Sequence, residues 1–323
     1  MRSKFKTLLI IGGSGFFAKS IIDNIYYYSF FKKIKKIILL SRSVNKIKID
    51  RTVNNKFKIK TIRGDISKLK KIPFADYIIY CAINYNYDED YKAVKNYLNL
   101  AKKNHLKSKI LYISSGAVYG KQPETNKGFK ENYLQFNNKI SFKKSYKKEY
   151  SKIKLKNEKL FQQFGKTGAK VSIARCFSFV GPNLPLNTNY VIGNIINNIL
   201  RNENIIIKAN YKIIRSYMYS DDLVRWLLKI LDNSSNQCPI YNVGSNNIIS
   251  IHKVANLLAK KYNLKILSSK ISLKKIDKYI PNIDKAKSEL NLNINNSSLQ
   301  AIQKTINFFL KNTFKKIKLA GVA

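Results

Sequence analysis

The sequence predicts an α/β fold in which a doubly wound parallel sheet is combined with a smaller C-terminal α/β lobe. Short apolar runs that suggest buried strands alternate with helical patterns over the first half of the chain, and this alternation is typical of parallel sheets. A glycine-rich turn directly follows the first apolar run. The 323 residues and an apolar content of 45% suit one large globular domain or two modest ones.

The first predicted strand covers residues 7–11 and leads through a glycine turn into a helical run that extends to about residue 29. Strand, glycine turn and helix in this order are typical of dinucleotide binding, because glycine lets the backbone turn tightly and approach a pyrophosphate. The phosphates then lie at the helix N-terminus. We therefore expect cofactor contacts from Gly12, Ser14, Gly15, Phe16 and Phe17.

The residues after the second predicted strand, 37–40, indicate which cofactor is preferred. An Asp or Glu at this point usually holds the ribose hydroxyls of NAD, whereas an Arg can accommodate the 2′-phosphate of NADP. This chain has Ser41, Arg42 and Ser43 there, and no acid before Asp50. The pattern favours NADP, with NAD as the alternative, since a single Arg can be incidental in so basic a chain.

Two further predicted strands end in residues suited to the cofactor. Asp65 and Ile66 follow the third strand, where the carboxylate of Asp65 could accept from an adenine amino group or cap a following helix. Cys81 and Ala82 end the fourth strand and are expected to lie beneath the cofactor.

A serine, a tyrosine and a lysine mark the predicted reaction centre. Ser115 follows an apolar strand, so it should lie at the carboxyl edge of the sheet, where open α/β sheets bind ligands. Tyr150 and Lys154 lie one turn apart on one face of a predicted helix. Two other tyrosines, Tyr28 and Tyr91, also precede a lysine by four residues, but neither is preceded by a strand ending in two serines. The prediction therefore depends on the sequence context of Tyr150 and Lys154, not on the spacing alone.

The alternation of elements ends after the strand predicted at 171–177. We expect residues 1–180 to form the nucleotide-binding domain, with 215–245 returning to it. Residues 181–323 should mainly form a smaller substrate-binding lobe over the carboxyl edge of the sheet. The cleft between these two parts is the expected binding site.

The formal charge of +43 allows two interpretations. It could be the footprint of a nucleic-acid or nucleotide ligand. The basic residues, however, are spread along the whole chain, whereas a nucleic-acid surface should be clustered. We therefore predict no specific nucleic acid partner, although such a field should speed the capture of phosphorylated ligands.

The cysteines, Cys81, Cys176 and Cys238, lie in apolar surroundings without metal-ligand spacing, so buried reduced thiols and no metal site are expected. No apolar segment reaches the length needed to span a bilayer, and the first apolar run is too short for a secretory signal. These patterns predict a cytoplasmic protein without membrane insertion.

Seven motifs follow one another along the chain: Gly12 to Ala18, Gly64 to Ile66, Ser114 to Gly120, Tyr150 with Lys154, Arg175 to Pro182, Arg215 to Asp222 and Tyr241 to Gly244. Taken in this order, they resemble those of the extended short-chain dehydrogenase/reductase family, the nucleotide-sugar epimerases, dehydratases and reductases. The resemblance covers about residues 5–310. It implies a Rossmann domain, a nicotinamide cofactor, a nucleoside-diphosphate sugar in the C-terminal lobe, and a homodimer built from the helices near 88–103 and 146–164.

The resemblance also implies a role for each site residue. Tyr150 would be the acid/base, Lys154 would hold the nicotinamide ribose and lower the pKa of Tyr150, and Ser115 would bind the reacting sugar oxygen. Further contacts would come from Phe177 to the cofactor, and from Ser178 and Arg215 to the substrate, with the arginine suited to a diphosphate.

One departure from the family pattern narrows the reaction. Dehydratases of the family place Asp-Glu directly after the catalytic hydroxyl, where this chain has Gly116 and Ala117, so 4,6-dehydration is disfavoured. We predict NADPH-dependent reduction of the 4-keto group of a nucleoside-diphosphate 4-keto-6-deoxyhexose, in the synthesis of surface-polysaccharide sugars. An NAD-dependent nucleotide-sugar 4-epimerase is the alternative, and a non-catalytic RNA-binding Rossmann protein is the lower alternative.

Overall fold

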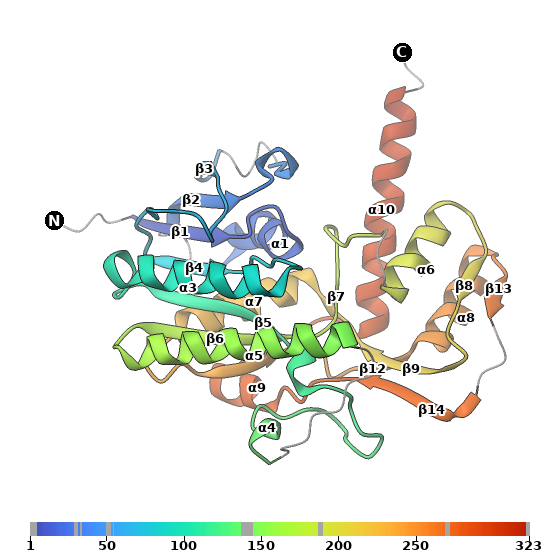
Figure 1. Ribbon diagram of the computed structural model, residues 1–323. Helices are drawn as coiled ribbons and strands as arrows, with labels where there is room; N and C mark the ends of the chain where they lie inside the picture. Colours follow the sequence, from blue (N-terminus) through green and yellow to red (C-terminus); the bar gives the residue numbers. More distant parts are fainter. Residues whose placement is uncertain are drawn as a thin grey trace.

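The computed structural model describes residues 5–28, 32, 34–49, 53, 55–136, 145–186, 190–268 and 272–320. Its centre is a seven-stranded sheet in the order β11-β6-β5-β4-β1-β2-β3, with all neighbours parallel. Figure 1 shows this sheet with its helices beside a smaller second lobe. The sheet strands are β1 (Lys6–Ile11), β2 (Ile34–Ser41), β3 (Lys58–Arg63), β4 (Tyr77–Tyr80), β5 (Lys109–Ser115), β6 (Lys170–Cys176) and β11 (Ile240–Val243).

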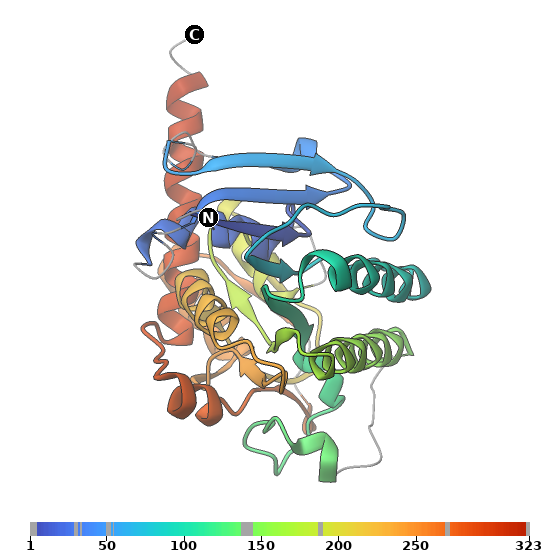
Figure 2. The same ribbon diagram turned by 90° about the vertical axis from the view of Figure 1, so that its left-hand side faces the viewer.

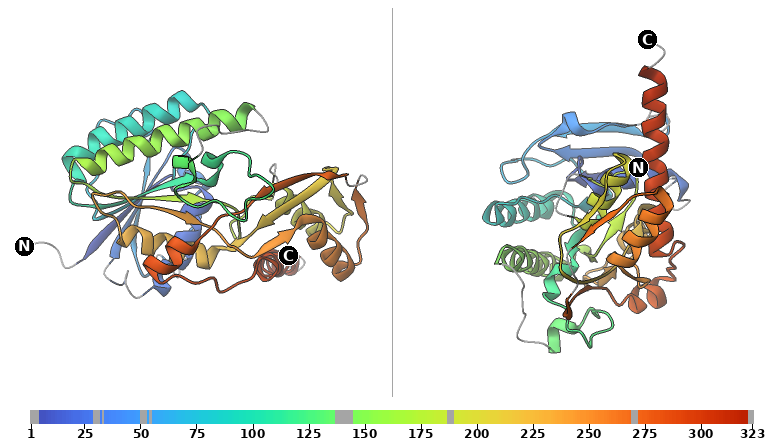
Figure 3. Two further views of the ribbon diagram at one scale, coloured as in Figure 1. Left: turned by 90° about the horizontal axis from the view of Figure 1, so that it is seen from below. Right: turned by 90° about the vertical axis from the view of Figure 1, so that its right-hand side faces the viewer.

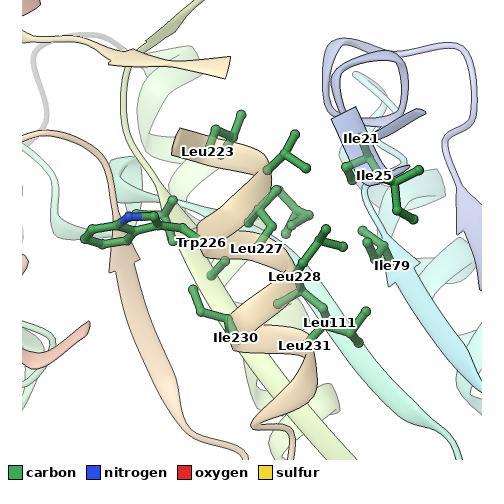
Figure 4. Packing of buried hydrophobic residues seen from close by; sticks show 14 of the residues in the cluster. Ile21, Ile25, Ile79, Leu111, Leu223, Trp226, Leu227, Leu228, Ile230 and Leu231 are labelled. Atoms are coloured by element: carbon green, nitrogen blue, oxygen red, sulfur yellow. The ribbon is translucent and has the colours of Figure 1, made fainter. Parts of the chain in front are cut away.

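Helices cover both faces of the sheet, as the predicted α/β class requires. On one face lie α1 (Phe16–Asn24) and α7 (Ser220–Asp232), and on the other α3 (Tyr87–Asn104) and α5 (Ser145–Lys166) (Figure 2). Figure 4 shows the apolar side chains of α7 packed against α1, β4 and β5. The only tryptophan, Trp226, is fully buried there.

Alternate residues of the central strands enter the two cores. In β1, Leu8 and Ile10 belong to the core with α1 and α7, whereas Leu9 and Ile11 belong to the core with α3 and α5. Because both faces are covered, the strand is continuously apolar from Leu8 to Ile11 instead of alternating with polar residues. This is the reason that such runs could be recognised as buried strands.

The second lobe has its own apolar core and three small sheets, in the orders β12-β9-β14, β13-β8 and β10-β7. Figure 3 shows it at one end of the sheet. The strands outside the main sheet are β7 (Phe179–Val180), β8 (Ile205–Ile207), β9 (Tyr211–Ser216), β10 (Met218–Tyr219), β12 (Ile248–Ser250), β13 (Ile266–Ser268) and β14 (Ser272–Tyr279). The remaining helices are α4 (Tyr133–Phe136), α6 (Val191–Leu200), α8 (Ile251–Tyr262), α9 (Asp284–Leu290) and α10 (Ser298–Ala320), with 3₁₀ turns η1 (Ile25–Tyr27), η3 (Val44–Lys46) and η4 (Gly116–Tyr119).

The predicted strands are present with small shifts of their ends, and the first helix is shorter than predicted. It ends at Asn24 and tightens into η1, whereas the pattern suggested a helix to about residue 29, which lies outside the described residues. In the part of the chain that the structure describes, no helix combines the length and the apolar character needed to cross a membrane.

Candidate active site

The glycine turn after β1 leaves room for a ligand at the N-terminus of α1. Gly12 has φ of +102°, and a Cβ there would lie 2.6 Å from the backbone nitrogen of Ala82, so this position requires glycine. A Cβ at Gly15 would meet only the Gly12 oxygen, at 3.5 Å, among the described atoms within 4 Å. The space in front of the helix is therefore open, and its unpaired N–H groups suit a pyrophosphate.

The end of β2 lies beside the same turn. Ser14 and Ser41 are joined through their hydroxyls at 2.9 Å, and Ser41 also accepts from the Ser43 N–H at 3.1 Å. Arg42 is exposed and donates to the Ile83 carbonyl at 3.4 Å. A guanidinium at this point can meet a ribose phosphate without first leaving a buried ion pair.

Asp65 lies within the electrostatic reach of Arg42. It accepts from both the N–H and the hydroxyl of Ser67, at 3.0 and 2.7 Å, and a turn follows it where a helix was the alternative expectation. Partial burial raises the pKa of Asp65, but the two Ser67 hydrogen bonds, with the charge of Arg42, lower it overall. Ile66 is buried in the core with α3 and α5, so only its backbone can contact a ligand.

Cys81 and Ala82 form the floor beneath the glycine turn. Burial raises the pKa of the Cys81 thiol to about 12, so the thiol is neutral, and it points at the Gly12 carbonyl with Sγ at 3.8 Å. The close contact between the backbones of Ala82 and Gly12 fixes the depth of the turn. These two residues therefore shape the surface on which a cofactor can lie.

Ser115 ends β5 and begins the 3₁₀ turn η4, accepting from the Ala117 N–H at 3.1 Å. The next residue must be glycine, because a Cβ at Gly116 would lie 2.6 Å from the ring of Phe177. Phe177, from the end of β6, thus packs directly behind the serine. The turn leaves the Ser115 hydroxyl at the carboxyl edge of the sheet, as predicted.

Tyr150 brings its hydroxyl from α5 to Ser115, close enough for a hydrogen bond that lowers the pKa of the tyrosine. Burial is the larger effect, however, and raises the pKa of Tyr150 to about 12. The expectation that Lys154 lowers this pKa is not met by the protein alone, because the ammonium lies 6.0 Å from the Tyr150 ring centroid and contacts other groups. In this structure Tyr150 is a protonated phenol.

Lys154 lies in the interior, with 4% of its surface exposed. Its ammonium donates to the Ile113 carbonyl at 3.3 Å and lies 5.1 Å from the centroid of the Tyr112 ring. Although burial lowers the pKa of Lys154, the nearby Tyr112 oxygen and the Asp90 carboxylate raise it overall. The lysine is thus charged and held at the base of the site.

Sequence reasoning missed Tyr279, which comes from β14 in the second lobe. Its ring packs on Phe177 with centroids 4.7 Å apart, and its hydroxyl is close enough to Ser115 to be influenced by hydrogen bonding. Burial strongly raises the pKa of Tyr279, so it too is a neutral phenol. No local pattern distinguishes it from the other tyrosines of this chain; only its position in the folded lobe does.

The two predicted substrate residues are less clearly placed. Arg215 is the strand partner of Tyr279, but its guanidinium forms an ion pair with Asp277 at 3.2 Å and donates to two carbonyls. Ser178 is half-buried next to Phe177, and its carbonyl accepts from the Met218 N–H. The structure brings Ser115, Tyr150 and Lys154 together, whereas Arg215 is already engaged within the lobe.

A buried polar network supports the site from below. Glu158, one turn after Lys154, binds Arg175 at 2.8 Å and accepts from the Ser114 hydroxyl at 2.5 Å. Arg175 also donates to Tyr119, which in turn donates to Asn242 at 2.8 Å. This network connects α5, β5, β6 and β11, so it fixes the serine strand against the tyrosine helix.

The described residues include no group of three or more His, Cys, Asp or Glu side chains that could hold a metal ion. The site can bind a dinucleotide across the glycine turn, and it presents two phenols and a serine hydroxyl to a polar ligand. Such an arrangement can transfer a proton to or from an oxygen atom.

Comparisons with known proteins agree with this geometry. Residues 8–244 match the model of the NAD dependent epimerase/dehydratase family. A comparison with curated protein sequences found no significant match.

Solved structures with the same fold share few residues with this chain. A dTDP-glucose 4,6-dehydratase from Bacillus anthracis, in complex with NAD, is 18% identical with a TM-score of 0.74, over 95% of this chain and 97% of that one. A UDP-glucose 4-epimerase from Thermotoga maritima is 18% identical with a TM-score of 0.75, over 95% and 99%. A UDP-N-acetylglucosamine 4-epimerase from Methanobrevibacter ruminantium is 17% identical with a TM-score of 0.73, over 96% and 100%. The glycine turn, the parallel sheet and the match over most of the chain place this protein in the NAD-dependent epimerase/dehydratase family.

Proposed function

We propose that the protein is an NADPH-dependent reductase that acts on the 4-keto group of a nucleoside-diphosphate 4-keto-6-deoxyhexose. The observation that carries the proposal is the meeting of Ser115, Tyr150 and Lys154 at the carboxyl edge of the sheet, without a carboxylate beside the serine. Gly116 and Ala117 occupy the positions where elimination of water would need acids. The reduced nucleotide sugar would serve the synthesis of surface-polysaccharide sugars.

The protonation state of Tyr150 supports the reductive direction. A bound nicotinamide cofactor would supply the hydride, and the chain must then supply a proton to the resulting oxyanion. Since burial raises the pKa of Tyr150 to about 12, the phenol carries that proton at neutral pH. Ser115 orients the sugar oxygen by hydrogen bonding and stabilises the charge that develops on it.

The cofactor would be held along the edge that the glycine turn begins. The glycine turn would leave the N-terminus of α1 accessible to the pyrophosphate, and Lys154 would bind the nicotinamide ribose. The exposed guanidinium of Arg42 favours a 2′-phosphate, and therefore NADPH over NADH. Phe177 and Cys81 would provide apolar contacts to the cofactor.

The substrate would lie between Ser115 and the second lobe. The similar folds of a UDP-glucose 4-epimerase and a UDP-N-acetylglucosamine 4-epimerase support a nucleotide sugar as its class. To bind a diphosphate, Arg215 would have to exchange part of its contact with the Asp277 carboxylate for a contact with a phosphate. The large positive charge would speed the approach of such an anion at low salt.

We further propose a homodimer that is formed by α3 and α5, as the family resemblance implies. The exposed faces of these helices carry many lysines, among them Lys95, Lys152, Lys156 and Lys159. Two such faces repel each other across a two-fold axis, so this dimer would depend on counter-ions.

The test is NADPH consumption after addition of a nucleotide-linked 4-keto-6-deoxyglucose, with Tyr150→Phe and Arg42→Ala in parallel. We expect rapid loss of NADPH absorbance, almost none with Tyr150→Phe, and weaker use of NADPH but unchanged use of NADH with Arg42→Ala. Normal turnover by Tyr150→Phe would end the proposal. A protein that interconverts nucleotide hexoses with bound NAD, and consumes no cofactor, would be the 4-epimerase instead.

A further inference from the structure

Two buried charged side chains near the site form no ion pair with any residue that the structure describes. Among the described residues, the acids with the least exposure include Glu158, which pairs with the buried Arg175, and Asp222, which pairs with the half-buried Arg225. Asp90 is 2% exposed and Lys154 is 4% exposed, yet neither takes part in an ion pair within the described chain.

An isolated buried charge costs several kcal/mol, so a charged group in the interior needs compensation. Asp90 and Lys154 have opposite signs and come from α3 and α5, which pack side by side along one face of the sheet (Figure 3). Since the other buried charged side chains of the described residues are already paired, Asp90 and Lys154 are left to compensate each other's charge. Burial raises the pKa of Asp90 overall, and the charge of Lys154 opposes that rise, while Asp90 in turn raises the pKa of Lys154.

The groups between them form a path with consistent donor and acceptor roles. Asn157, one turn after Lys154, donates from Nδ2 to the Asp90 carboxylate at 3.0 Å. The other carboxylate oxygen accepts from the Asn84 N–H at 2.7 Å. The Tyr112 hydroxyl lies near both Asn157 and Lys154, close enough for each to act on it as a hydrogen-bond partner.

Two buried polar atoms between Lys154 and Asp90 still need hydrogen-bond partners. Within the described chain, the Tyr112 hydroxyl and the Asn157 Oδ1 are buried without a hydrogen bond that meets full distance and angle criteria. Both needs are met if Tyr112 accepts from the Lys154 ammonium and donates to Asn157 Oδ1. With these two hydrogen bonds formed, every donor in the series points from the lysine toward the carboxylate.

We propose that Asp90 is a positioning residue for Lys154, acting as its counter-charge through Tyr112 and Asn157. The proposal rests on the proposed function only for the role of Lys154 toward the cofactor. Asp90 keeps the lysine charged and fixed at the base of the site. The Asp90 carboxylate also accepts from the Asn84 N–H, so it connects the loop after β4 to the same series of hydrogen bonds.

Other titratable groups around Lys154 cannot replace Asp90. Burial raises the pKa values of the Cys81 and Cys176 thiols, and those of the Tyr112 and Tyr150 phenols, so all four are neutral at pH 7. Arg42 acts on Asp90 from the cofactor side but is exposed, so solvent screens its charge.

The first test is a double-mutant cycle on stability, which needs no substrate. Unfolding midpoints would be measured for the wild type, Asp90→Asn, Lys154→Met and the double variant. Asp88→Asn, which removes a charge from the exposed side of the same helical turn, is the matched control. We expect each single variant to lose stability, the double variant to unfold at a higher midpoint than either, and the control to behave as wild type. If the stability losses of the two single variants simply add in the double variant, the proposed pairing of Asp90 with Lys154 is wrong.

If Asp90→Asn does not fold alone, the pH dependence of Lys154→Met carries the test. Without the lysine, burial holds the pKa of Asp90 above its unfolded value more strongly, so stability falls as pH rises through that range. Relative to wild type, Lys154→Met should therefore lose stability as the pH rises from the titration range of an unfolded Asp toward neutrality. A constant difference across that range would refute the proposal.

The second test measures NADPH binding by fluorescence as a function of pH. Asp90→Asn should lose affinity at a lower pH than wild type, because its lysine loses the proton more easily, while Asp88→Asn should match wild type. The double-mutant cycle can show the expected coupling even if the protein binds no nicotinamide cofactor. That combination would support the pairing of Asp90 with Lys154 and contradict the proposed function. Binding with an unshifted pH profile in Asp90→Asn would contradict the positioning role.

Discussion

Removal of Arg175 should destabilise the protein far more than removal of an arginine from a surface ion pair. Arg175 and Glu158 are both about 95% buried or more, and the arginine makes three contacts with the Glu158 carboxylate at 2.8–3.3 Å. Loss of one partner leaves a buried charge without compensation, which costs about 3–5 kcal/mol. We therefore expect Arg175→Met to lower the free energy of unfolding by about that amount.

Arg201 provides the matched control, because its ion pair with Glu203 at 3.6 Å is exposed on both sides. Arg201→Met should cost less than ~1 kcal/mol. Urea unfolding can be followed by the fluorescence of the single tryptophan, which is fully buried in the sheet–helix core. The double variant Glu158→Met/Arg175→Met should recover most of the loss, since an apolar pair of similar size needs no desolvation of charge. Equal losses for Arg175→Met and Arg201→Met would refute the reasoning.

Four further predictions concern the site and the proposed dimer. Gly12→Ala should abolish NADPH binding in fluorescence titrations while the chain still folds, because the added Cβ meets the Ala82 backbone at 2.6 Å and φ is positive; retained affinity would contradict this reading of the turn. Tyr279→Phe should lower the turnover number about tenfold without a change in the unfolding midpoint, since one hydroxyl at Ser115 is lost. With the pKa of Tyr150 raised to about 12, NADPH oxidation in stopped-flow traces should not slow between ~pH 7 and ~pH 9, and a decline there would identify another proton donor. Sedimentation equilibrium should show dimerisation that strengthens with salt, because the α3 and α5 faces are lysine-rich; dimers that dissociate in salt would favour another interface.

Much of the first half of the fold could be predicted from the sequence. The strand of residues 7–11, the glycine turn and the helix that follows depend on apolar runs, on backbone freedom at Gly12 and on neighbours a few residues apart. The proximity of Ser115, Tyr150 and Lys154 was also predictable, because a strand end and a helical spacing of four define it locally. These features are confirmed in the structure as positions, while their catalytic roles stay predictions.

Other features depend on contacts between distant parts of the chain. Tyr119 and Asn242, which donate and accept in one buried hydrogen bond, are 123 positions apart. Tyr279 reaches Ser115 only because β14 pairs with β9 in the second lobe. The ion pair that occupies Arg215 likewise comes from that strand.

Local periodicity and spacing in the sequence encode the parallel sheet, the expected place of a dinucleotide and the three residues of the predicted reaction centre. Which charges are buried, and which partner each one has, depends on contacts that exist only in the folded chain. Burial also determines that Tyr150 is protonated, since the removal of water from around the phenol outweighs its hydrogen bond to Ser115. Desolvation depends on every element that packs around a group, and no short stretch of sequence contains that information.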